Sequence, residues 1–305
     1  MTAMDRTAVT LRLPCATSYD WPAMLAFFRL RAVDGVEAVE GEVYRRAIRH
    51  EGVSGTVEVS PARGGDGLLA TLRLPDGTAP DGVVVRLRRM FDLDADLAAV
   101  NAHLAGDPVL APWVAARPAV RVPGGWDGFE VAMRAVIGQQ VSIAAARRLN
   151  SRLAERCGAG LPGAAGDGSR RLFPTPEQVL AADLSAMGMP GARIATLKAV
   201  AEAALADPGL FERGATVEET VAHLRAIKGI GEWTANYIAM RACREADAFP
   251  AGDVGLLRGM ADAAGRRPRP AELLARAAAW RPWRAYAAQH IWAADAALAG
   301  PPRPD

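Results

Sequence analysis

The chain of 305 residues has little cysteine, very little lysine and no long apolar run. Its cysteines, Cys15, Cys157 and Cys243, lie far apart and in no metal-ligand spacing, so we expect reduced thiols and neither a disulfide framework nor a zinc site. No stretch reaches 18 consecutive apolar residues, so no transmembrane helix is predicted. Residues 1–12 carry three charges and lack the apolar segment of a secretory signal, which favours a cytoplasmic location.

Charge is unevenly distributed along the chain. The net charge is +2, and only two lysines occur beside 34 arginines. Residues 1–120 carry 13 basic and 15 acidic side chains, whereas residues 121–305 carry 23 basic and 19 acidic ones. A weakly basic second part is compatible with a polyanionic partner such as DNA, but does not by itself indicate one.

Residues 1–90 show the pattern of a small antiparallel sheet. Five short segments alternate apolar and polar residues or are rich in β-branched residues, and each is bounded by Gly, Pro or Asp. One helix is predicted among them, over Trp21–Arg31, after start signals at Ser18 and Asp20. The predicted strands are Ala8–Pro14, Val36–Val43, Thr56–Ser60, Leu68–Leu74 and Val83–Leu87.

From Asp94 onward the apolar residues recur at helical spacing. The fold class is therefore α+β, with a small antiparallel-sheet domain over residues 1–93 and an all-α part over residues 94–305. The predicted helices are Asp94–Ala105, Asp127–Cys157, Thr175–Ala182, Gly191–Leu205, Val217–Ile227, Trp233–Ala242, Asp253–Ala264, Pro270–Ala278 and Trp283–Ala299.

The most informative segment is LRAIKGIGEWTANYIAMR, over Leu224–Arg241. Its KGIG tetrad lies between two segments with helical spacing, which predicts a tight hairpin between two helices. Gly229 and Gly231 leave backbone N–H groups uncovered where no Cβ blocks a phosphate, and we expect a positive φ at Gly231. Two glycines between packed helices also fit a plain C-cap and turn, so the glycines alone leave both interpretations open.

Other groups of this segment favour a hairpin that grips a DNA backbone without reading its sequence. Thr234 places a hydroxyl in the first turn of the second helix, where we expect it to reach the same phosphate as the glycine amides. The loop carbonyls of Arg225 and Ile227, turned away from the DNA, are candidates to bind a monovalent cation, Na⁺ or K⁺.

Asp253 follows this segment, in the sequence FPAGDVGLLRG. An aspartate at this place fits the N-cap of the helix that starts at Val254. A carboxylate so close to a DNA-binding hairpin also suggests chemistry beside it. The two roles, cap and catalyst, are compatible.

Together with further segments, these residues make the chain resemble the helix–hairpin–helix DNA glycosylases, and within them the 3-methyladenine DNA glycosylase II (AlkA) type. The resemblance implies base excision repair, in which an alkylated purine is flipped out of duplex DNA and its N-glycosidic bond is hydrolysed. It also implies two helical subdomains, one over 126–245 and one over 94–125 plus 246–299. The further matching segments are Tyr19-Asp20-Trp21, Arg89-Met90-Phe91-Asp92-Leu93, Phe129-Glu130, Arg134–Gln139, Phe173–Pro176, Gly188–Pro190, Trp283–Ala287 and His290–Trp292.

The resemblance assigns candidate site residues. It implies that Asp253 stabilises the oxocarbenium-like sugar and orients the attacking water, whereas Asp247 and Asp262 lie outside the matching frame. It implies a base pocket of aromatic residues that binds a cationic purine by cation–π attraction, although core packing would account for each residue singly. The pocket residues are Trp233, Tyr237, Trp292 and, from the N-terminal domain, Phe27, while Trp283, about 180° around the helix from Trp292, is assigned to the core.

The resemblance further implies a hydrolase without strand-cleaving lyase activity. Bifunctional relatives form a Schiff base through a lysine two residues after the second hairpin glycine, and Trp233 occupies that position here. Some relatives carry a four-cysteine iron–sulfur loop near the C-terminus, but no cysteine follows Cys243, so no cluster is expected. We expect a monomer that binds double-stranded DNA and no membrane, and that associates with the nucleoid in the cytoplasm.

Three positions depart from the family pattern. Val254 and Ala293 stand where the pattern has aromatic residues, which predicts a roomier or less strongly stacking pocket. Gln140 stands where a leucine wedges into the duplex; glutamine can plug the gap and bond to the orphaned base but stacks less well, or it packs on the helix around Val136–Ala144. The alternative functions are a glycosylase for a deaminated purine or mismatched base, and a non-catalytic helix–hairpin–helix DNA-binding protein.

Overall fold

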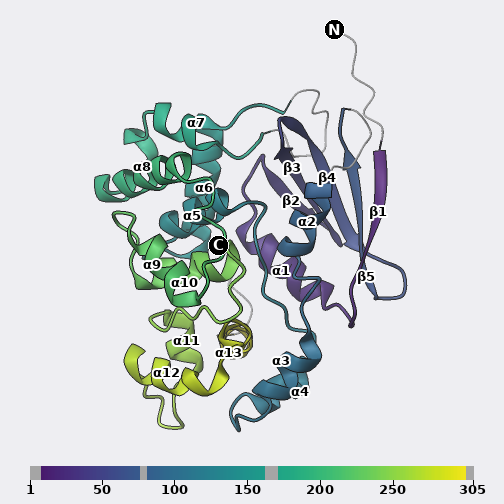
Figure 1. The fold of residues 1–305 in the computed structure, drawn as a ribbon, viewed down its shortest axis with the longest axis vertical. Helices are drawn as coiled ribbons and strands as arrows, with labels where there is room; N and C mark the ends of the chain where they lie inside the picture. Colours follow the sequence, from purple (N-terminus) through teal and green to yellow (C-terminus); the bar gives the residue numbers. More distant parts are fainter. Residues whose placement is uncertain (1–7, 76–80, 162–170, 300–305) are drawn as a thin grey trace.

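The structure, a computed structural model, describes residues 8–75, 81–161 and 171–299. Its N-terminal part is a five-stranded antiparallel sheet, and most of the helices lie to one side of this sheet (Figure 1). The strands follow the spatial order β1-β5-β4-β3-β2, and β3 pairs with β4 so that Ala47 lies opposite Thr56. They are β1 (Ala8–Pro14), β2 (Glu37–Glu40), β3 (Val43–His50), β4 (Val53–Pro61) and β5 (Gly67–Arg73).

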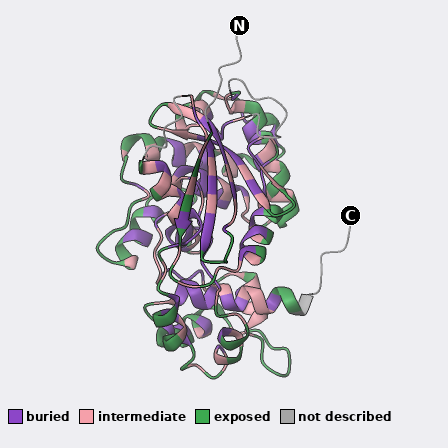
Figure 2. Cartoon of the chain, turned by 90° about the vertical axis from the view of Figure 1, so that its right-hand side faces the viewer, coloured by how far each residue is buried: buried purple, intermediate pink, exposed green. Residues whose placement is uncertain are grey.

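Two helices pack against the sheet and form a hydrophobic core with it. The first begins where Asp20 accepts a hydrogen bond from the Ala23 amide at 3.0 Å. Its Phe28 packs on Tyr44 of β3, with the ring centroids 4.8 Å apart. Figure 2 views the molecule from the sheet side and shows that much of each inner strand is buried. These helices are α1 (Trp21–Arg31) and α2 (Asp81–Met90).

One predicted strand is in fact a hairpin. The segment Val36–Val43 does not form a single strand, because β2 ends at Glu40 and β3 begins at Val43. Gly41, with a φ of 56°, reverses the chain between them. Apolar residues on both sides of the turn conceal it in the sequence.

A second predicted strand, Val83–Leu87, is wrong because this segment lies in the helix α2. Its amino-acid composition favours a strand, but the spacing of its apolar residues is that of a helix. It is rich in valine, which is typical of strands. The buried residues of α2, however, are Val83, Leu87 and Met90, which are spaced by four and three positions as one face of a helix requires.

The rest of the described chain is helical, and its apolar faces meet in one continuous core. This core includes residues from α3 through to α13. The domain boundary at residue 93 and the division into two helical subdomains are not tested by it and stay predictions. The α+β fold class is confirmed. The helices are α3 (Leu97–Leu104), α4 (Ala111–Ala116), α5 (Gly128–Ile137), α6 (Ile143–Cys157), α7 (Pro176–Ala181), α8 (Gly191–Ala206), α9 (Val217–Arg225), α10 (Glu232–Arg241), α11 (Val254–Gly259), α12 (Pro270–Ala277) and α13 (Arg284–Ala299).

The predicted helix Asp127–Cys157 is two helices, α5 and α6. Between them Gln140 takes a φ of 56°, which a helix cannot accommodate. Ser142 then caps α6 by accepting a hydrogen bond from the Ala145 amide at 3.2 Å. The interruption therefore places an exposed, non-helical loop at Gln140.

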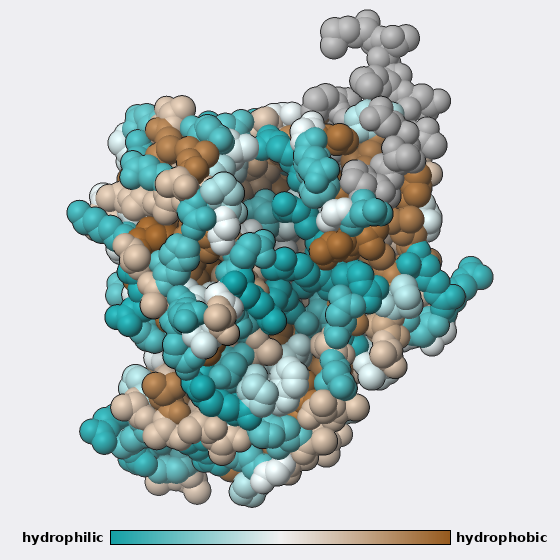
Figure 3. All heavy atoms as spheres, in the orientation of Figure 1, coloured by the Kyte–Doolittle hydropathy of each residue, from teal (hydrophilic) through white to brown (hydrophobic). Residues whose placement is uncertain are grey.

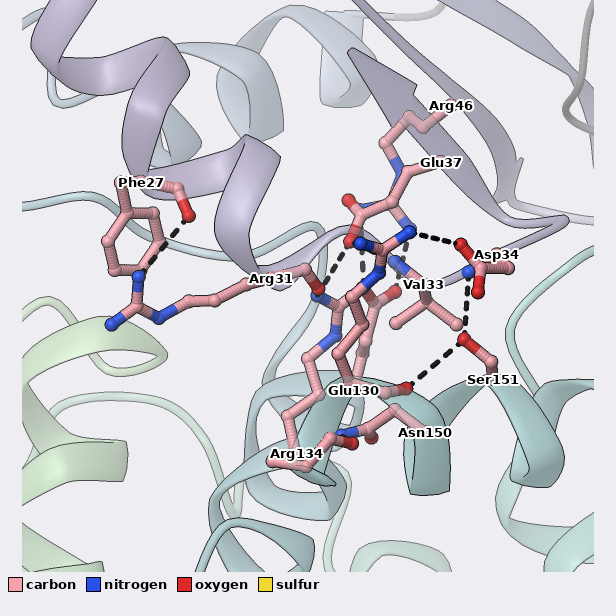
Figure 4. Close-up of polar contacts among 12 residues, drawn as sticks. Phe27, Arg31, Val33, Asp34, Glu37, Arg46, Glu130, Arg134, Asn150 and Ser151 are labelled. Carbon is pink, nitrogen blue, oxygen red and sulfur yellow. Dashed lines mark hydrogen bonds and ion pairs between the residues drawn. The ribbon is translucent and has the colours of Figure 1, made fainter. Parts of the chain in front are cut away.

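Buried ion pairs connect the sheet part to the helices (Figure 4). Glu130 of α5 accepts a hydrogen bond from Arg46 of β3 at 2.7 Å and one from Arg134 at 2.5 Å. Arg134 also lies 2.7 Å from Glu37 of β2. The side chains of Arg46 and Glu130 are only 1% and 2% exposed. Burial alone would raise the pKa of Glu130, but the two guanidinium groups hold it below its usual value.

We expect Glu130→Gln to destabilise the protein strongly, because it leaves Arg46 and Arg134 buried with one negative charge fewer. Breaking a buried ion pair costs about 3–5 kcal/mol, and urea unfolding should show a loss of this size. The control is Glu218→Gln, which breaks an exposed pair with Arg281 and should cost less than about 1 kcal/mol. Equal losses in the two variants would contradict this account.

Candidate active site

The hairpin between α9 and α10 is buried on one side and exposed on the other. Leu224, Ile227 and Ile230 pack into the helical core. Lys228 and both glycines are exposed. The hairpin is thus fixed by its apolar residues while its glycine backbone stays open to a ligand.

The two glycines serve different purposes. Gly229 has a φ of 91°, and an added Cβ would lie 1.9 Å from the Oγ1 of Thr196 on α8. Gly231 has a φ of −87° and caps α10, and an added Cβ would meet nothing within 4 Å. The expected positive φ at Gly231 is therefore wrong, and it is Gly229 that has it. At Gly231 the open space lies outside the protein, at the start of a helix, where an anion is favoured.

Gln139 connects the α5–α6 loop to this hairpin. Its side-chain Nε2 donates to the Thr234 hydroxyl at 3.0 Å and to the Gly229 backbone carbonyl at 3.4 Å. The backbone carbonyl of Gln139 accepts a hydrogen bond from Arg193 at 2.7 Å. Thr234 is only 3% exposed, and its hydroxyl accepts the hydrogen bond from Gln139. The expected contact of this hydroxyl with a DNA phosphate stays a prediction. The neighbouring Gln140 is exposed, and its role as a wedge stays a prediction.

Asp253 is held by donors from three helices. As N-cap of α11 its Oδ1 accepts from the amides of Gly255 at 2.9 Å and Leu256 at 3.1 Å. The same oxygen accepts from the indole N–H of Trp292 on α13 at 2.8 Å. Its Oδ2 accepts from the indole N–H of Trp233 on α10 at 2.9 Å. Capping uses Oδ1, so Oδ2 keeps acceptor capacity for a ligand.

A cavity of about 960 Å³ opens beside this carboxylate, between the sheet part and the helices. Trp233 and Tyr237 are stacked in its wall, with ring centroids 5.2 Å apart and planes inclined by 21°. In the space-filling view, hydrophilic side chains cover the centre of the face over the junction of the two parts (Figure 3). All residues predicted for catalysis and base binding line the cavity: Phe27, Trp233, Tyr237, Asp253 and Trp292.

Two of the three positions that depart from the family pattern, Val254 and Ala293, also line this cavity. Val254 is 61% exposed, and Ala293 lies on α13 directly after Trp292. Neither position supplies an aromatic ring, so the cavity wall is less aromatic here than the pattern predicts. Trp283 instead packs against the helical core, with its ring edge-on to Tyr286.

Arg241 also lines the cavity, although it was not predicted from the sequence as a site residue. Its guanidinium carbon lies 4.6 Å from the ring centre of Phe27, 4.7 Å from that of Tyr237 and 5.4 Å from that of Trp292. It is 5% exposed, and its Nη1 donates to the Pro123 carbonyl at 2.7 Å. A cation–π contact therefore already exists in this cavity, made by the protein itself.

The charge of Arg241 survives its burial. Burial lowers the pKa of Arg241 to about 10, with the nearby Arg31 guanidinium acting in the same direction. Burial would raise the pKa of Tyr237, but Arg241 and Arg31 lower it below its usual value. A sequence signal was available, since Arg241 follows Tyr237 by four and Trp233 by eight positions on the same helix face.

Other classes of site are not found among the described residues. Within residues 8–75, 81–161 and 171–299, no group of three His, Cys, Asp or Glu side chains could hold a metal ion. No helix in these ranges has the length and apolarity needed to cross a bilayer. The carbonyl of Ile227, proposed as a cation ligand with that of Arg225, accepts the Ile230 amide at 3.0 Å.

Two family models match the chain over most of its length. The model of the AlkA N-terminal domain matches residues 10–127. The model of the HhH-GPD superfamily of base excision DNA repair proteins matches residues 133–285. The sheet part and the part with hairpin and cavity thus each have a matching family.

Among curated proteins, the chain is 36% identical over 282 residues to "DNA-3-methyladenine glycosylase 2" of Escherichia coli, covering 90% of this chain and 93% of that protein. It is 37% identical over 285 residues to the "probable bifunctional transcriptional activator/DNA repair enzyme AlkA" of Mycobacterium tuberculosis, covering 93% of this chain. The chain spans only 56% of the length of the latter.

Among solved structures, the fold is similar to that of a 3-methyladenine DNA-glycosylase from Archaeoglobus fulgidus. The TM-score is 0.79, and the match covers 93% of this chain and 98% of the other. The sequence identity is 22%, so this likeness concerns the fold alone.

We expect Gly229→Ala to destabilise the protein by ~2 kcal/mol or more, because alanine resists the positive φ and its Cβ clashes with Thr196. The matched variant Gly231→Ala should change the unfolding free energy by less than about 0.5 kcal/mol. Thermal or urea unfolding measures both. Thr196→Ala in the Gly229→Ala background should recover part of the loss, and a lack of any recovery would contradict the proposed clash.

Proposed function

Because the chain belongs to the HhH-GPD superfamily of base excision DNA repair proteins, we propose that it is a monofunctional DNA glycosylase. It hydrolyses the N-glycosidic bond of alkylated purines, of the 3-methyladenine and 7-methylguanine type, in duplex DNA and leaves an abasic site. The name of the similar Escherichia coli protein supports this substrate class. The observation that carries the proposal is Asp253, fixed by two tryptophans at the wall of an aromatic cavity next to the exposed hairpin.

DNA binding begins with the hairpin. The exposed amide at Gly231 and the start of α10 contact a backbone phosphate, which positions the duplex without reading its sequence. The damaged nucleotide leaves the base stack and enters the cavity, whose volume of about 960 Å³ lies within the range of ligand pockets. Gln140 fills the gap left behind.

Bond cleavage depends on charge at Asp253. As the base departs with the electron pair of the glycosidic bond, positive charge grows on the sugar. The carboxylate of Asp253 stabilises this charge, and its Oδ2 accepts a hydrogen bond from the attacking water. Its position is preorganised because Trp233 and Trp292 already hold both oxygens.

A Schiff-base mechanism does not fit the cavity. Trp233 occupies the position of the lysine nucleophile and uses its indole N–H on Asp253. The only lysines of the chain, Lys198 and Lys228, are absent from the cavity wall. The protein therefore releases the base without cutting the strand.

The surroundings of the enzyme are part of the proposal. It acts on double-stranded DNA as a monomer, in the cytoplasm and bound to the nucleoid. It needs no iron–sulfur cluster or other cofactor for the reaction. The carbonyls of Arg225 and Ile227 bind Na⁺ or K⁺ beneath the hairpin, which stabilises the backbone that faces the phosphate; the Ile227 carbonyl retains a lone pair for this besides its bond to Ile230.

We expect wild-type protein to release methylated purines from alkylated duplex DNA, with no strand cleavage and no adduct trapped by borohydride. Asp253→Asn should reduce the release rate by about 10²-fold or more, because the charge that stabilises the transition state is lost. Duplex affinity should stay at least as high. Asp262→Asn, an exposed capping aspartate away from the cavity, is the control and should leave release unchanged. An Asp253→Asn variant of normal rate would refute the assigned role.

Gln140→Ala should slow excision from paired duplex DNA and matter less when the target base is already unpaired, because the plug is needed to hold the stack open. Gln140→Leu should restore or exceed the wild-type rate, since an apolar plug stacks better. Single-turnover rates on matched and unpaired targets measure the difference. Equal slowing on both targets would show that Gln140 acts through folding and not as a wedge.

A further inference from the structure

Arg241 has an unusual position for a buried arginine. Its guanidinium is surrounded by Phe27, Tyr237 and Trp292 in the wall of the cavity. The groups that most affect it electrostatically are Tyr237, Arg31 and Arg244, none of which is a carboxylate. Its Nε has no hydrogen-bond partner within the part of the chain that the structure describes. Among the described residues the cavity therefore contains a positive charge that the phenol of Tyr237 stabilises but for which no carboxylate partner is found.

Trp292 relates this charge to Asp253. The indole N–H of Trp292 donates to Asp253, whereas its ring faces Arg241. Tyr237, which also contacts Arg241, stacks on Trp233, and that indole donates to the other oxygen of Asp253. Trp292 on one side, and stacked Tyr237 and Trp233 on the other, thus lie between the negative carboxylate of Asp253 and the positive guanidinium of Arg241.

On this basis, and resting on the proposed glycosylase function, we propose that Arg241 is a specificity-determining residue that extends the substrate range: it raises excision of uncharged lesions relative to that of the cationic alkylated purines. The effect depends on the charge of the base. When the glycosidic bond breaks, the base takes the electron pair, water adds to the sugar carbon, and the water proton passes to solvent. An uncharged purine leaves as an anion that solvent protonates, whereas a cationic purine leaves as a neutral base.

The fixed cation acts differently on these two classes. It attracts the negative charge that develops on an uncharged base, so it stabilises that transition state. It repels a cationic base when this base first binds, and the ring of Phe27, which would attract the base, already contacts Arg241 and Arg31. Arg241 therefore raises kcat/KM for uncharged lesions and weakens ground-state binding of cationic ones.

The test compares one uncharged and one cationic lesion, hypoxanthine and 7-methylguanine, in the same duplex. In Arg241→Met the ratio of kcat/KM for hypoxanthine to that for 7-methylguanine should fall by ~10-fold or more. Arg241→Lys keeps the charge and should keep the ratio within about threefold of wild type even if both rates fall. Arg276→Met removes a positive charge on α12 outside the cavity and should leave the ratio unchanged.

A binding measurement separates charge from packing. In the Asp253→Asn background, Arg241→Met should tighten binding to 7-methylguanine duplex relative to hypoxanthine duplex. Arg241→Gln, which keeps a donor for the Pro123 carbonyl, replaces Arg241→Met if unfolding curves show that the latter is not folded. Parallel losses on both lesions, or a wild-type enzyme that releases 7-methylguanine but no hypoxanthine, would overturn the role of Arg241. Failure of the wild type to release either base would instead refute the glycosylase function.

Discussion

The site depends on the carboxylate of Asp253 because this one group joins three helices from distant parts of the chain. Its oxygens accept hydrogen bonds from a backbone amide at the start of α11 and from the indole N–H groups of Trp233 on α10 and Trp292 on α13. A carboxylate met by fixed donors cannot turn freely, so its charge keeps one position relative to the cavity. The same bonds orient both indole rings. The charge of the site and the aromatic wall of the cavity are therefore set together, and a change in one disturbs the other.

The sheet part belongs to the site as well as to the fold. Phe27 of α1 forms part of the cavity wall and contacts Arg241 of α10. Buried ion pairs of Glu130 and Arg134 of α5 with Arg46 of β3 and Glu37 of β2 connect the sheet part to the helices. Such pairs contribute little net stability over an apolar core, but an unpaired member is costly. They therefore favour one arrangement of sheet and helices, which fixes the distance across the cavity.

Features that belong to one short segment could be predicted from the sequence, whereas features that depend on tertiary contacts could not. The hairpin, the capping aspartate and the aromatic residues could be predicted because each belongs to a short segment with a recognisable spacing. The positive φ was assigned to Gly231 instead of Gly229, and the close approach of Thr196 on α8 to Gly229 could not be predicted from the hairpin segment alone. Arg241 was missed because a single arginine in a helix is ordinarily solvent-exposed. Val83–Leu87 was misassigned because its valine content outweighed its helical spacing.

The link made by Gln139 has a consequence for how such a protein meets DNA. Gln139 bonds to the hairpin at Thr234, and the next residue is the exposed Gln140, so the distance from the glycine amides to the loop tip is set before DNA arrives. A regular duplex offers its phosphates and base steps at spacings of its own, and bending it costs energy. The hairpin amides and the loop tip at Gln140, held at a fixed separation, fit best where the base stack is easily deformed. Damaged base pairs unstack most readily. A hairpin and a loop tip held in this way would meet the local stiffness of a duplex before any chemical group of a base.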